Sequence, residues 1–277
     1  MKPTLAVRDI PGLFTAGQIN GSSGYEEAAA QGLLAGINAG LYCKNEPPLL
    51  LGRDEAYIGV LADDLAIKGT PEPYRMMTSR CEYRLLLRQD NADVRLTEKT
   101  LRTGLISAER YERLRRKQER VAEARRSLDR HIGRTEQLEE LLARHGEAVP
   151  KNGTTLFELL KHPGMTYTEL LSVCSDLPEL DWEITEQVET LARYDGYIQK
   201  QQNQVERSHA LENTLLPEDV DYMKLDGLRL EARQKLNRQK PSSIGQAARI
   251  SGVSPADIQV LLIYCKRGFE EGKESGT

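Results

Sequence analysis

The residues that decide the fold read GLFTAGQINGSSGYEEAAAQGLLAGINAGLYCK and occupy positions 12–44. The first part, Gly12–Gly17, is small and apolar and predicts a short buried strand. The next part, Gln18–Gly24, is rich in Gly, Asn and Ser, which tolerate positive φ and form side-chain hydrogen bonds within turns. The remainder predicts a helix that begins at Tyr25. The pattern is therefore a strand, a glycine-rich turn and a helix.

The junction between this turn and this helix favours an anionic ligand. A helix N-terminus presents free backbone N–H groups and the positive end of the helix dipole, which suit phosphates and anionic cofactor atoms. The dinucleotide fingerprint GxGxxG does not occur in the sequence, so a dinucleotide would find only part of its binding site here. Gly32, Gly36 and Gly40 would line one side of the helix and let a neighbouring element approach closely.

The rest of the chain is mainly helical in pattern. Apolar residues at helical spacing predict two long helices, over 107–132 and 183–213. Near the C-terminus the pattern predicts two helices joined by a glycine turn, the second with Ser254 as N-cap and Pro255 at its first position. One stretch differs: in CEYRLLLR (81–88) apolar and charged residues alternate, which favours a strand, although its arginines also recur every four residues, as on a helix. Shorter helices are predicted over 53–66, 135–145, 154–161 and 166–174, and a proline-bracketed break over 69–73.

Composition excludes several classes of protein. Hydrophobic residues make up 39% of the chain and charged residues 29%, which excludes a wholly disordered chain. No run of about 18 apolar residues is present, so we expect no membrane span. The N-terminus lacks a basic-then-apolar leader. Four cysteines without CxxC or metal-ligand spacing predict free thiols in a reducing cytoplasm and no metal site; they are Cys43, Cys81, Cys174 and Cys265.

A basic stretch interrupts an acidic chain. Of the 38 Lys and Arg and the 42 Asp and Glu, 15 and 8, respectively, lie between Tyr74 and Arg126. Guanidinium groups suit phosphate oxygens, and interleaved tyrosines can stack on unpaired bases. The alternative is a solvated helix face on which Arg and Glu pair. We favour that alternative for 110–126, whereas binding and structural roles stay equally open for 75–95. The candidate binding residues are Arg75, Arg80, Arg84, Arg88 and Arg95.

The C-terminal pair of helices, over 244–266, has the outline of a DNA-reading helix-turn-helix. Its second helix, PADIQVLLIYCKR, is apolar where a recognition helix needs polar side chains for base edges. A pair of core helices, or a surface that docks a protein, is the better interpretation.

Two long stretches closely resemble the MnmG (GidA) family. They are LFTAGQINGSSGYEEAAAQGLLAGINAG (13–40) and PEPYRMMTSRCEYRLLLRQDNADVRLT (71–97). The resemblance continues through RYDGYIQKQ (193–201) to IGQAARISGVSPADIQVLLIYCKR (244–267). One departure is Cys81, where the family pattern has a small residue such as Ala. The family is the flavoprotein subunit of a complex that modifies the wobble uridine of tRNA.

The resemblance implies a fold and a place in a longer protein. Family members are more than twice as long, and their GxGxxG site for FAD, an NADH-related domain and their catalytic cysteines lie upstream. We therefore expect the C-terminal part of such a protein, without catalytic residues of its own. The expected fold class is mainly α, with a helical C-terminal region preceded by the last strand and helix of an α/β FAD-binding domain. The implied regions are 1–45 (end of the FAD domain), 46–105 (mixed segment with the basic motif), 106–213 (helical domain) and 214–277 (helical subdomain for partner docking).

The resemblance also implies roles for residues and partners. The residues that would close over the flavin are Gly17, Gln18, Asn20, Gly21, Ser23, Gly24 and Tyr25, and the five candidate arginines match the motif implicated in tRNA contact. The last helical region would dock a GTPase of the MnmE type, and the full-length protein would form a homodimer. The implied reaction uses FAD, NADH, methylenetetrahydrofolate and glycine or ammonium to place a carboxymethylaminomethyl or aminomethyl group on carbon 5 of uridine-34.

Two alternatives stay open. The chain could be a free-standing helical adaptor that binds nucleic acid without catalysis, although such an adaptor has no need of the turn at 18–25. The basic stretch at 75–126 could also be only a structural network of salt bridges.

Overall fold

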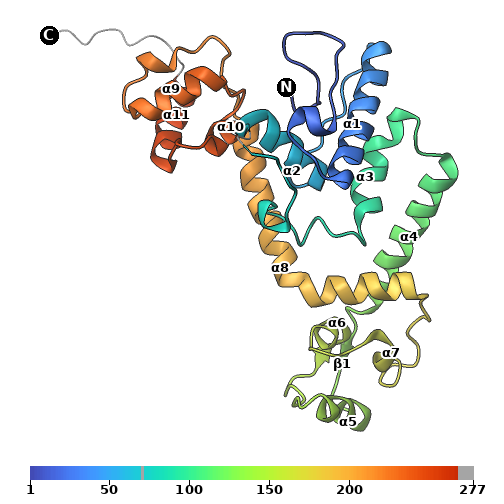
Figure 1. Ribbon diagram of the computed structural model, residues 1–277. Coiled ribbons are helices and arrows are strands. Elements are labelled where there is room, and N and C mark those ends of the chain that lie inside the picture. The colour runs from blue at the N-terminus through green and yellow to red at the C-terminus, as the bar shows by residue number, and fades with distance from the viewer. Residues whose placement is uncertain (70–71, 268–277) are drawn as a thin grey trace. The chain divides into compact units, whose positions relative to one another are not determined.

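A computed structural model describes residues 1–69 and 72–267 (Figure 1). The chain divides into two compact units, one formed by Met1–Arg84 with Gln201–Thr277 and the other by Leu85–Lys200. Residues 70–71, inside the predicted break, and the last ten residues of the predicted region 214–277 lie outside the described residues.

The chain is predominantly helical, as the sequence predicts. The first unit contains α1 (Tyr25–Cys43), α2 (Tyr57–Asp63), α9 (Leu230–Gln239), α10 (Ile244–Arg249) and α11 (Pro255–Arg267), with 3₁₀ helices at Gly17–Asn20, Thr78–Arg80 and Tyr222–Lys224 and a π-helical turn at Asp64–Lys68. The second unit contains α3 (Ala92–Thr100), a 3₁₀ helix at Leu101–Thr103, α4 (Ala108–Ser127), α5 (Glu136–Arg144), α6 (Leu156–Leu160) and α7 (Tyr167–Leu170). The long helix α8 (Trp182–Glu212) belongs to both units.

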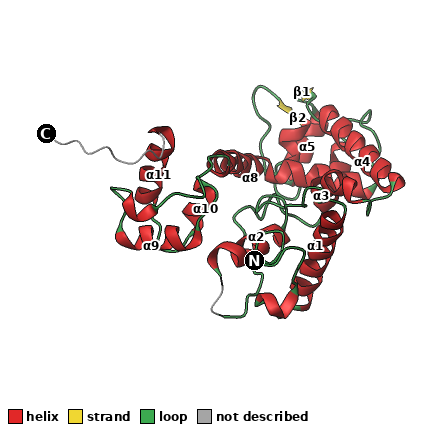
Figure 2. Ribbon diagram, turned by 90° about the horizontal axis from the view of Figure 1, so that it is seen from above, coloured by secondary structure: helices red, strands yellow, loops and turns green. Residues whose placement is uncertain are grey.

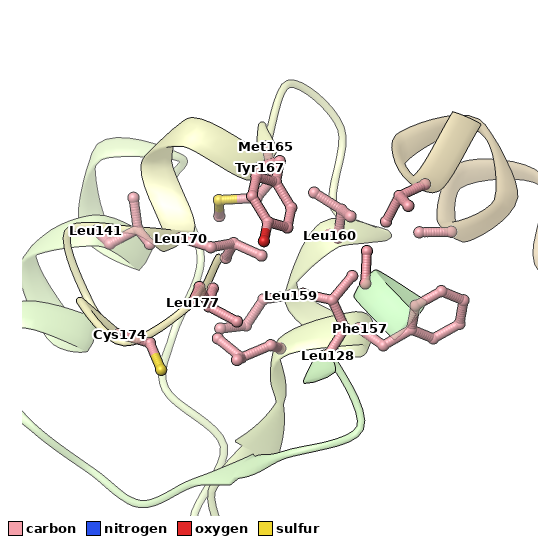
Figure 3. Close-up of a cluster of buried hydrophobic side chains, with 14 of the residues drawn as sticks. Leu128, Leu141, Phe157, Leu159, Leu160, Met165, Tyr167, Leu170, Cys174 and Leu177 are labelled. Carbon is pink, nitrogen blue, oxygen red and sulfur yellow. The ribbon is translucent and has the colours of Figure 1, made fainter. Parts of the chain in front are cut away.

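The second unit is built around one apolar core, of which Figure 3 shows a part. Leu138, Leu141 and Leu142 are spaced three and four residues apart on α5, so one face of the helix is buried. Burying each such leucine stabilises the folded state by about 1.5–3 kcal/mol, because its apolar surface is removed from water. Two short strands, β1 (His131–Ile132) and β2 (Thr154–Thr155), pair antiparallel and are yellow in Figure 2.

Hydroxyl side chains fix where several of these helices begin. Ser107, Thr135, Thr155 and Thr166 each accept a hydrogen bond from the backbone N–H three residues later. At Thr166 the carboxylate of Glu169 also accepts from the Thr166 N–H, which completes a capping box. These caps explain why the helices that the sequence predicts from residues 107, 135, 154 and 166 begin within two residues of those positions.

The C-terminal bundle, which comprises α9, α10 and α11, has its own core. Ile258 and Leu261 of α11 are buried in it. The interpretation of residues 244–266 as a core helical pair is therefore confirmed. Ser254 accepts a hydrogen bond from the Asp257 N–H, and α11 begins at Pro255, as predicted. Helix α9 is absent from the sequence-based predictions.

Two predicted strands are wrong. At Gly12–Gly17 the structure has one isolated bridge, between Ala6 and Phe14, and a 3₁₀ helix begins at Gly17. The stretch 81–88 forms turns after a 3₁₀ helix. A strand needs a hydrogen-bonded neighbour, and the described part of the chain offers neither stretch a ladder. The alternation at 81–88 instead reflects the burial of Cys81 and Leu87 and the exposure of Glu82 and Arg84 between them.

The helix glycines differ in what surrounds them. A Cβ atom at Gly32, Gly36 or Gly40 of α1 would meet nothing within 4 Å in the described chain, so no close neighbour explains them. A Cβ atom at Gly59 of α2 would lie 2.2 Å from the Gly52 carbonyl oxygen. Only glycine fits there without moving the backbone.

We predict that Gly59→Ala lowers the free energy of unfolding by about 1–3 kcal/mol, because the added methyl overpacks a rigid backbone contact. The matched substitution Gly36→Ala should instead raise it by about 0.5–1 kcal/mol, because alanine loses less backbone entropy in a helix. Urea unfolding of both variants measures the difference. Equal stabilities would contradict the close approach at Gly59.

Candidate functional site

The predicted cofactor-binding residues lie in one turn that side chains hold against α1. Gly17 and Gly21 both have positive φ, 76° and 81°, which glycine adopts without strain. The Gly17 N–H donates to Oε1 of Gln31, 3.0 Å away, and Asn20 Nδ2 donates to the same oxygen at 2.9 Å. Asn20 also donates to the Thr15 carbonyl at 2.8 Å. The side chains of Gln31 and Asn20 therefore fix the shape of the turn.

A buried carboxylate ties the start of α1 to a distant segment. Oε1 of Glu27 accepts from the Met76 N–H at 3.0 Å and from Arg75 Nε at 3.1 Å. The N–H of Met76, the N–H of Glu27 itself and the Arg75 guanidinium hold the pKa of Glu27 below its ordinary value of 4.5. A Cβ atom at Gly24 would lie 1.8 Å from Glu27 Oε2, so a larger residue there would have to displace the Glu27 carboxylate. The Tyr74 N–H adds a hydrogen bond to the Gly21 carbonyl at 2.6 Å.

Three buried polar atoms next to this turn have no hydrogen-bond partner among the described residues. They are Ser22 Oγ, Glu27 Oε2 and Gln31 Nε2. Buried polar atoms are nearly always paired, so such a cluster calls for a further group. Ile19 and Tyr25 expose 78% and 91% of their surface beside it. Exposed apolar side chains next to one another are typical of a surface that another group covers.

The structure places the seven candidate cofactor residues as follows. Gln18, Ser23 and Tyr25 are exposed, whereas Gly17 and Gly24 are buried and serve the shape of the turn. Asn20 and Gly21 are half-buried. The residues that sequence reasoning missed here are Glu27, beyond its place in the first helical turn, and Gln31. The contact of Glu27 reaches 49 residues along the chain and that of Gln31 reaches 14, which no local pattern reveals.

The five candidate arginines do not share one environment. Arg75, Arg80 and Arg84 are exposed and belong to the first unit. The guanidinium carbon of Arg80 lies 4.5 Å from the centre of the Tyr74 ring, a cation–π contact. Neither Arg80 nor Arg84 forms an ion pair with a described residue, so both charges stay available to a ligand.

The other two arginines belong to the second unit and are half-buried. Arg88 Nε pairs with Asp90 Oδ1 at 3.0 Å, and its Nη1 donates to the Leu85 carbonyl at 2.7 Å. Arg95 donates to Asn91 Oδ1 at 2.9 Å and to the Arg88 carbonyl at 2.8 Å. Their donors bind groups of the chain itself, which is what a structural role requires.

Charged side chains of α4 pair with carboxylates of the same helix and of neighbouring helices. Arg115 lies 3.2 Å from Glu119 and 3.7 Å from Glu112 on the same helix. Lys117 contacts Asp93 at 3.0 Å and Glu183 at 3.1 Å. A pocket of about 450 Å³ there is lined by acids and bases alike. The solvated, paired face predicted for 110–126 describes this helix better than a polyanion site. The lining residues are Asp93, Thr97, Ser107, Glu109, Arg110, Arg113, Leu114, Lys117 and Glu183.

Comparison with known proteins extends these observations. Three family models match: the tRNA modifying enzyme MnmG/GidA C-terminal helical bundle over residues 204–276, the MnmG/GidA C-terminal helical domain over 108–202, and glucose inhibited division protein A over 1–47.

In the described part of the chain no helix is both long and apolar enough to cross a membrane. No three His, Cys, Asp or Glu side chains of the described residues gather where they could hold a metal ion.

Relatives and solved structures agree with the family models. A protein of Clostridium kluyveri named tRNA uridine 5-carboxymethylaminomethyl modification enzyme MnmG is 51% identical over 272 residues, which are 98% of this chain and 43% of the relative. A protein of the same name from Lachnoclostridium phytofermentans is 53% identical over 268 residues, again 43% of its length. The form II crystal structure of Aquifex aeolicus GidA superposes with a TM-score of 0.82 at 38% identity and covers 96% of this chain and 42% of that one. The chain thus spans less than half the length of these relatives.

We predict that Glu27→Gln lowers the free energy of unfolding at pH 7 by about 1.5–3 kcal/mol, because hydrogen bonds to a charged acceptor are replaced by weaker ones. The pKa of Glu27 is lowered in the folded state, so its contribution is complete above about pH 4.5 and is lost as the pH falls further. Urea unfolding at pH 7 and in mild acid should show the gap between protein and variant closing.

The control is Glu26→Gln, which changes an exposed carboxylate in the same helical turn. It should alter stability by no more than about 0.5 kcal/mol. If the difference in free energy of unfolding between the protein and Glu27→Gln stays constant with pH, the negative charge of Glu27 is not what holds Met76 and Arg75.

Proposed function

Because this chain belongs to the MnmG/GidA family, we propose that it is the tRNA-holding and partner-docking part of an FAD-dependent enzyme that modifies the wobble uridine of tRNA. The whole protein places a carboxymethylaminomethyl or aminomethyl group on carbon 5 of uridine-34. The observation that carries the proposal for this part is that Arg80 and Arg84 are exposed and form no ion pair with a described residue.

These arginines suit a folded RNA. Phosphate contacts from exposed guanidinium groups supply affinity and position the RNA without reading its sequence. Among the described residues no carboxylate pairs with Arg80 or Arg84, so binding phosphate costs them no ion pair there. Arg75 already pairs with Glu27, and Arg88 and Arg95 bind within the chain. We therefore assign direct contact to Arg80 and Arg84 first, and a supporting role to the other three.

The turn at 17–25 is proposed as one wall of the flavin site. FAD, when bound, supplies the redox chemistry, which NADH and methylenetetrahydrofolate would feed in the whole protein. The chain's own part is to present the N–H groups at the start of α1 and the exposed side chains of Ile19 and Tyr25. Gly24 leaves room for Glu27, whose charge Arg75 partly balances. No residue of this chain is proposed to be catalytic.

The C-terminal bundle is proposed to dock a GTPase of the MnmE type, and the whole protein is proposed to form a homodimer. Although the bundle buries Ile258 and Leu261, it leaves Leu230 and Ile263 63% and 49% exposed. Apolar side chains on a small helical bundle are what a protein partner would cover. A free-standing adaptor remains the second candidate, but it gives no reason for the three unpaired polar atoms beside the turn.

The tRNA proposal predicts a change in salt dependence. Arg80→Ala and Arg84→Ala should each weaken tRNA binding and lower the slope of log K against log salt by about 0.7–0.9 for each phosphate that the variant no longer neutralises. Arg115→Ala, which removes a cation already paired on α4, is the control and should leave the slope unchanged. Equal, salt-steep binding of tRNA and duplex DNA would favour a generic basic patch instead.

The flavin proposal predicts that this chain, expressed alone, does not retain yellow flavin, because it lacks the GxGxxG that cradles the pyrophosphate. Absorbance of the purified chain checks this directly. A stoichiometric flavin would show that the site is complete within these 277 residues.

A further inference from the structure

One buried guanidinium in the first unit contacts three carboxylates. The side chain of Arg53 is 10% exposed, and its nitrogens lie 3.0 Å from Asp63, 2.7 Å from Asp64 and 2.8 Å from Glu82. Although burial opposes the charge, the carboxylates of Glu82 and Asp64 raise the pKa of Arg53 above its ordinary value. Arg53 is therefore permanently charged, and each nitrogen of its guanidinium donates a hydrogen bond.

Arg53 holds the segment that carries the exposed arginines. Its Nη2 donates to both oxygens of Glu82, at 2.8 and 3.0 Å, and its Nε donates at 3.2 Å. Its Nη2 also lies 3.4 Å from the Arg80 carbonyl. Glu82 stands midway between Arg80 and Arg84 in the sequence. Because the Arg53 guanidinium binds Glu82 through several hydrogen bonds, it restricts the backbone of the neighbouring Arg80 and Arg84.

A second contact fixes the beginning of the same segment. The Tyr74 hydroxyl donates to Asp64 Oδ2 at 2.8 Å, and Asp64 pairs with Arg53. The ring of Tyr74 lies under the Arg80 guanidinium. The segment 74–84 is thus anchored at Tyr74 and at Glu82, with Arg53 common to both anchors.

The other side of Arg53 reaches the C-terminal bundle. Asp63 also pairs with Arg249 of α10, whose Nε lies 2.8 Å from Asp63 Oδ2. Arg249 in turn pairs with Glu212 at the end of α8. Glu212 accepts from Ser243, the N-cap of α10, at 2.8 Å. The anchor is therefore built on a packed helical framework.

We propose that Arg53 is a positioning residue, which holds Glu82 so that Arg80 and Arg84 are preorganised for the phosphates of a folded RNA. It also neutralises the carboxylate that would otherwise repel phosphate from between them. The inference rests on the proposed tRNA binding and goes beyond it, because it assigns the affinity to a residue that does not touch the RNA.

Glu82→Ala separates this inference from simple electrostatics. The substitution removes a negative charge from the arginine segment, so a basic patch without preorganisation would bind tRNA more tightly. If Arg53 positions the segment through Glu82, binding instead weakens, by about 3- to 10-fold, because flexible arginines must be ordered by the ligand. Glu82 is half-exposed, so its loss should leave the fold intact.

The matched control is Glu72→Ala, which removes the same charge from an exposed position on the approach to the segment. It should bind tRNA as tightly as the unaltered chain or more tightly. Amide hydrogen exchange should quicken over residues 75–88 in Glu82→Ala and stay unchanged in Glu72→Ala. Arg53→Lys, which keeps the charge but not the fork, should weaken binding in the same direction as Glu82→Ala.

The outcomes divide cleanly. Glu82→Ala binding as tightly as the unaltered chain, or more tightly, overturns the positioning role while leaving tRNA binding in place. Equal losses in Glu82→Ala and Glu72→Ala overturn it as well. No tRNA binding by the unaltered chain overturns the proposed function, and the inference falls with it. Weaker binding and faster exchange in Glu82→Ala alone support it.

Discussion

The first unit depends on the matching of buried charges. Arg53 cannot leave water without carboxylates around it, and Asp63 and Asp64 cannot be buried without a cation. Each partner is therefore a condition for burying the other, and together they fix the packing of α2. The C-terminal bundle joins this network through the ion pair between Arg249 and Asp63. Residues far apart in the sequence therefore balance each other's buried charges.

A second buried charge links the two proposed surfaces. Glu27 lies at the start of α1, beside the turn proposed to face the flavin, and binds Met76 and Arg75. Arg75 begins the segment that continues to Arg80 and Arg84. One carboxylate therefore sets both the turn and the first residues of the arginine segment, and any shift in one must be accommodated by the other.

Much of the helical fold could be predicted from the sequence. The N-termini of the long helices α1, α4 and α8 lie within two residues of the predicted positions, because apolar periodicity and capping side chains are local signals. The strand predictions for 12–17 and 81–88 are wrong, since apolar residues and alternation report burial and not the presence of a neighbouring strand. Helix α9 escapes prediction because, within LEARQKLNRQ, only Ala232 and Leu236 are buried, which is too sparse a stripe to recognise.

The candidate site shows the same division. The glycine-rich turn and the arginines stay predictions, which the sequence can offer because their patterns are local. The roles of Gln31 and Arg53 could not, because their partners are 14 and 29 residues away and only the fold brings them together. Local sequence patterns therefore suggest candidate ligand-binding residues more readily than the residues that hold those candidates in place.

The burial of Arg53 has a consequence for how an RNA would be released. Dissolved ions screen exposed charges strongly and buried pairs weakly. A rise in ionic strength would thus weaken phosphate contacts with the exposed Arg80 and Arg84 more than the pairs that Arg53 forms with Asp63 and Asp64. The segment 74–84 would keep its conformation after release. The next RNA would then bind without any refolding of the protein.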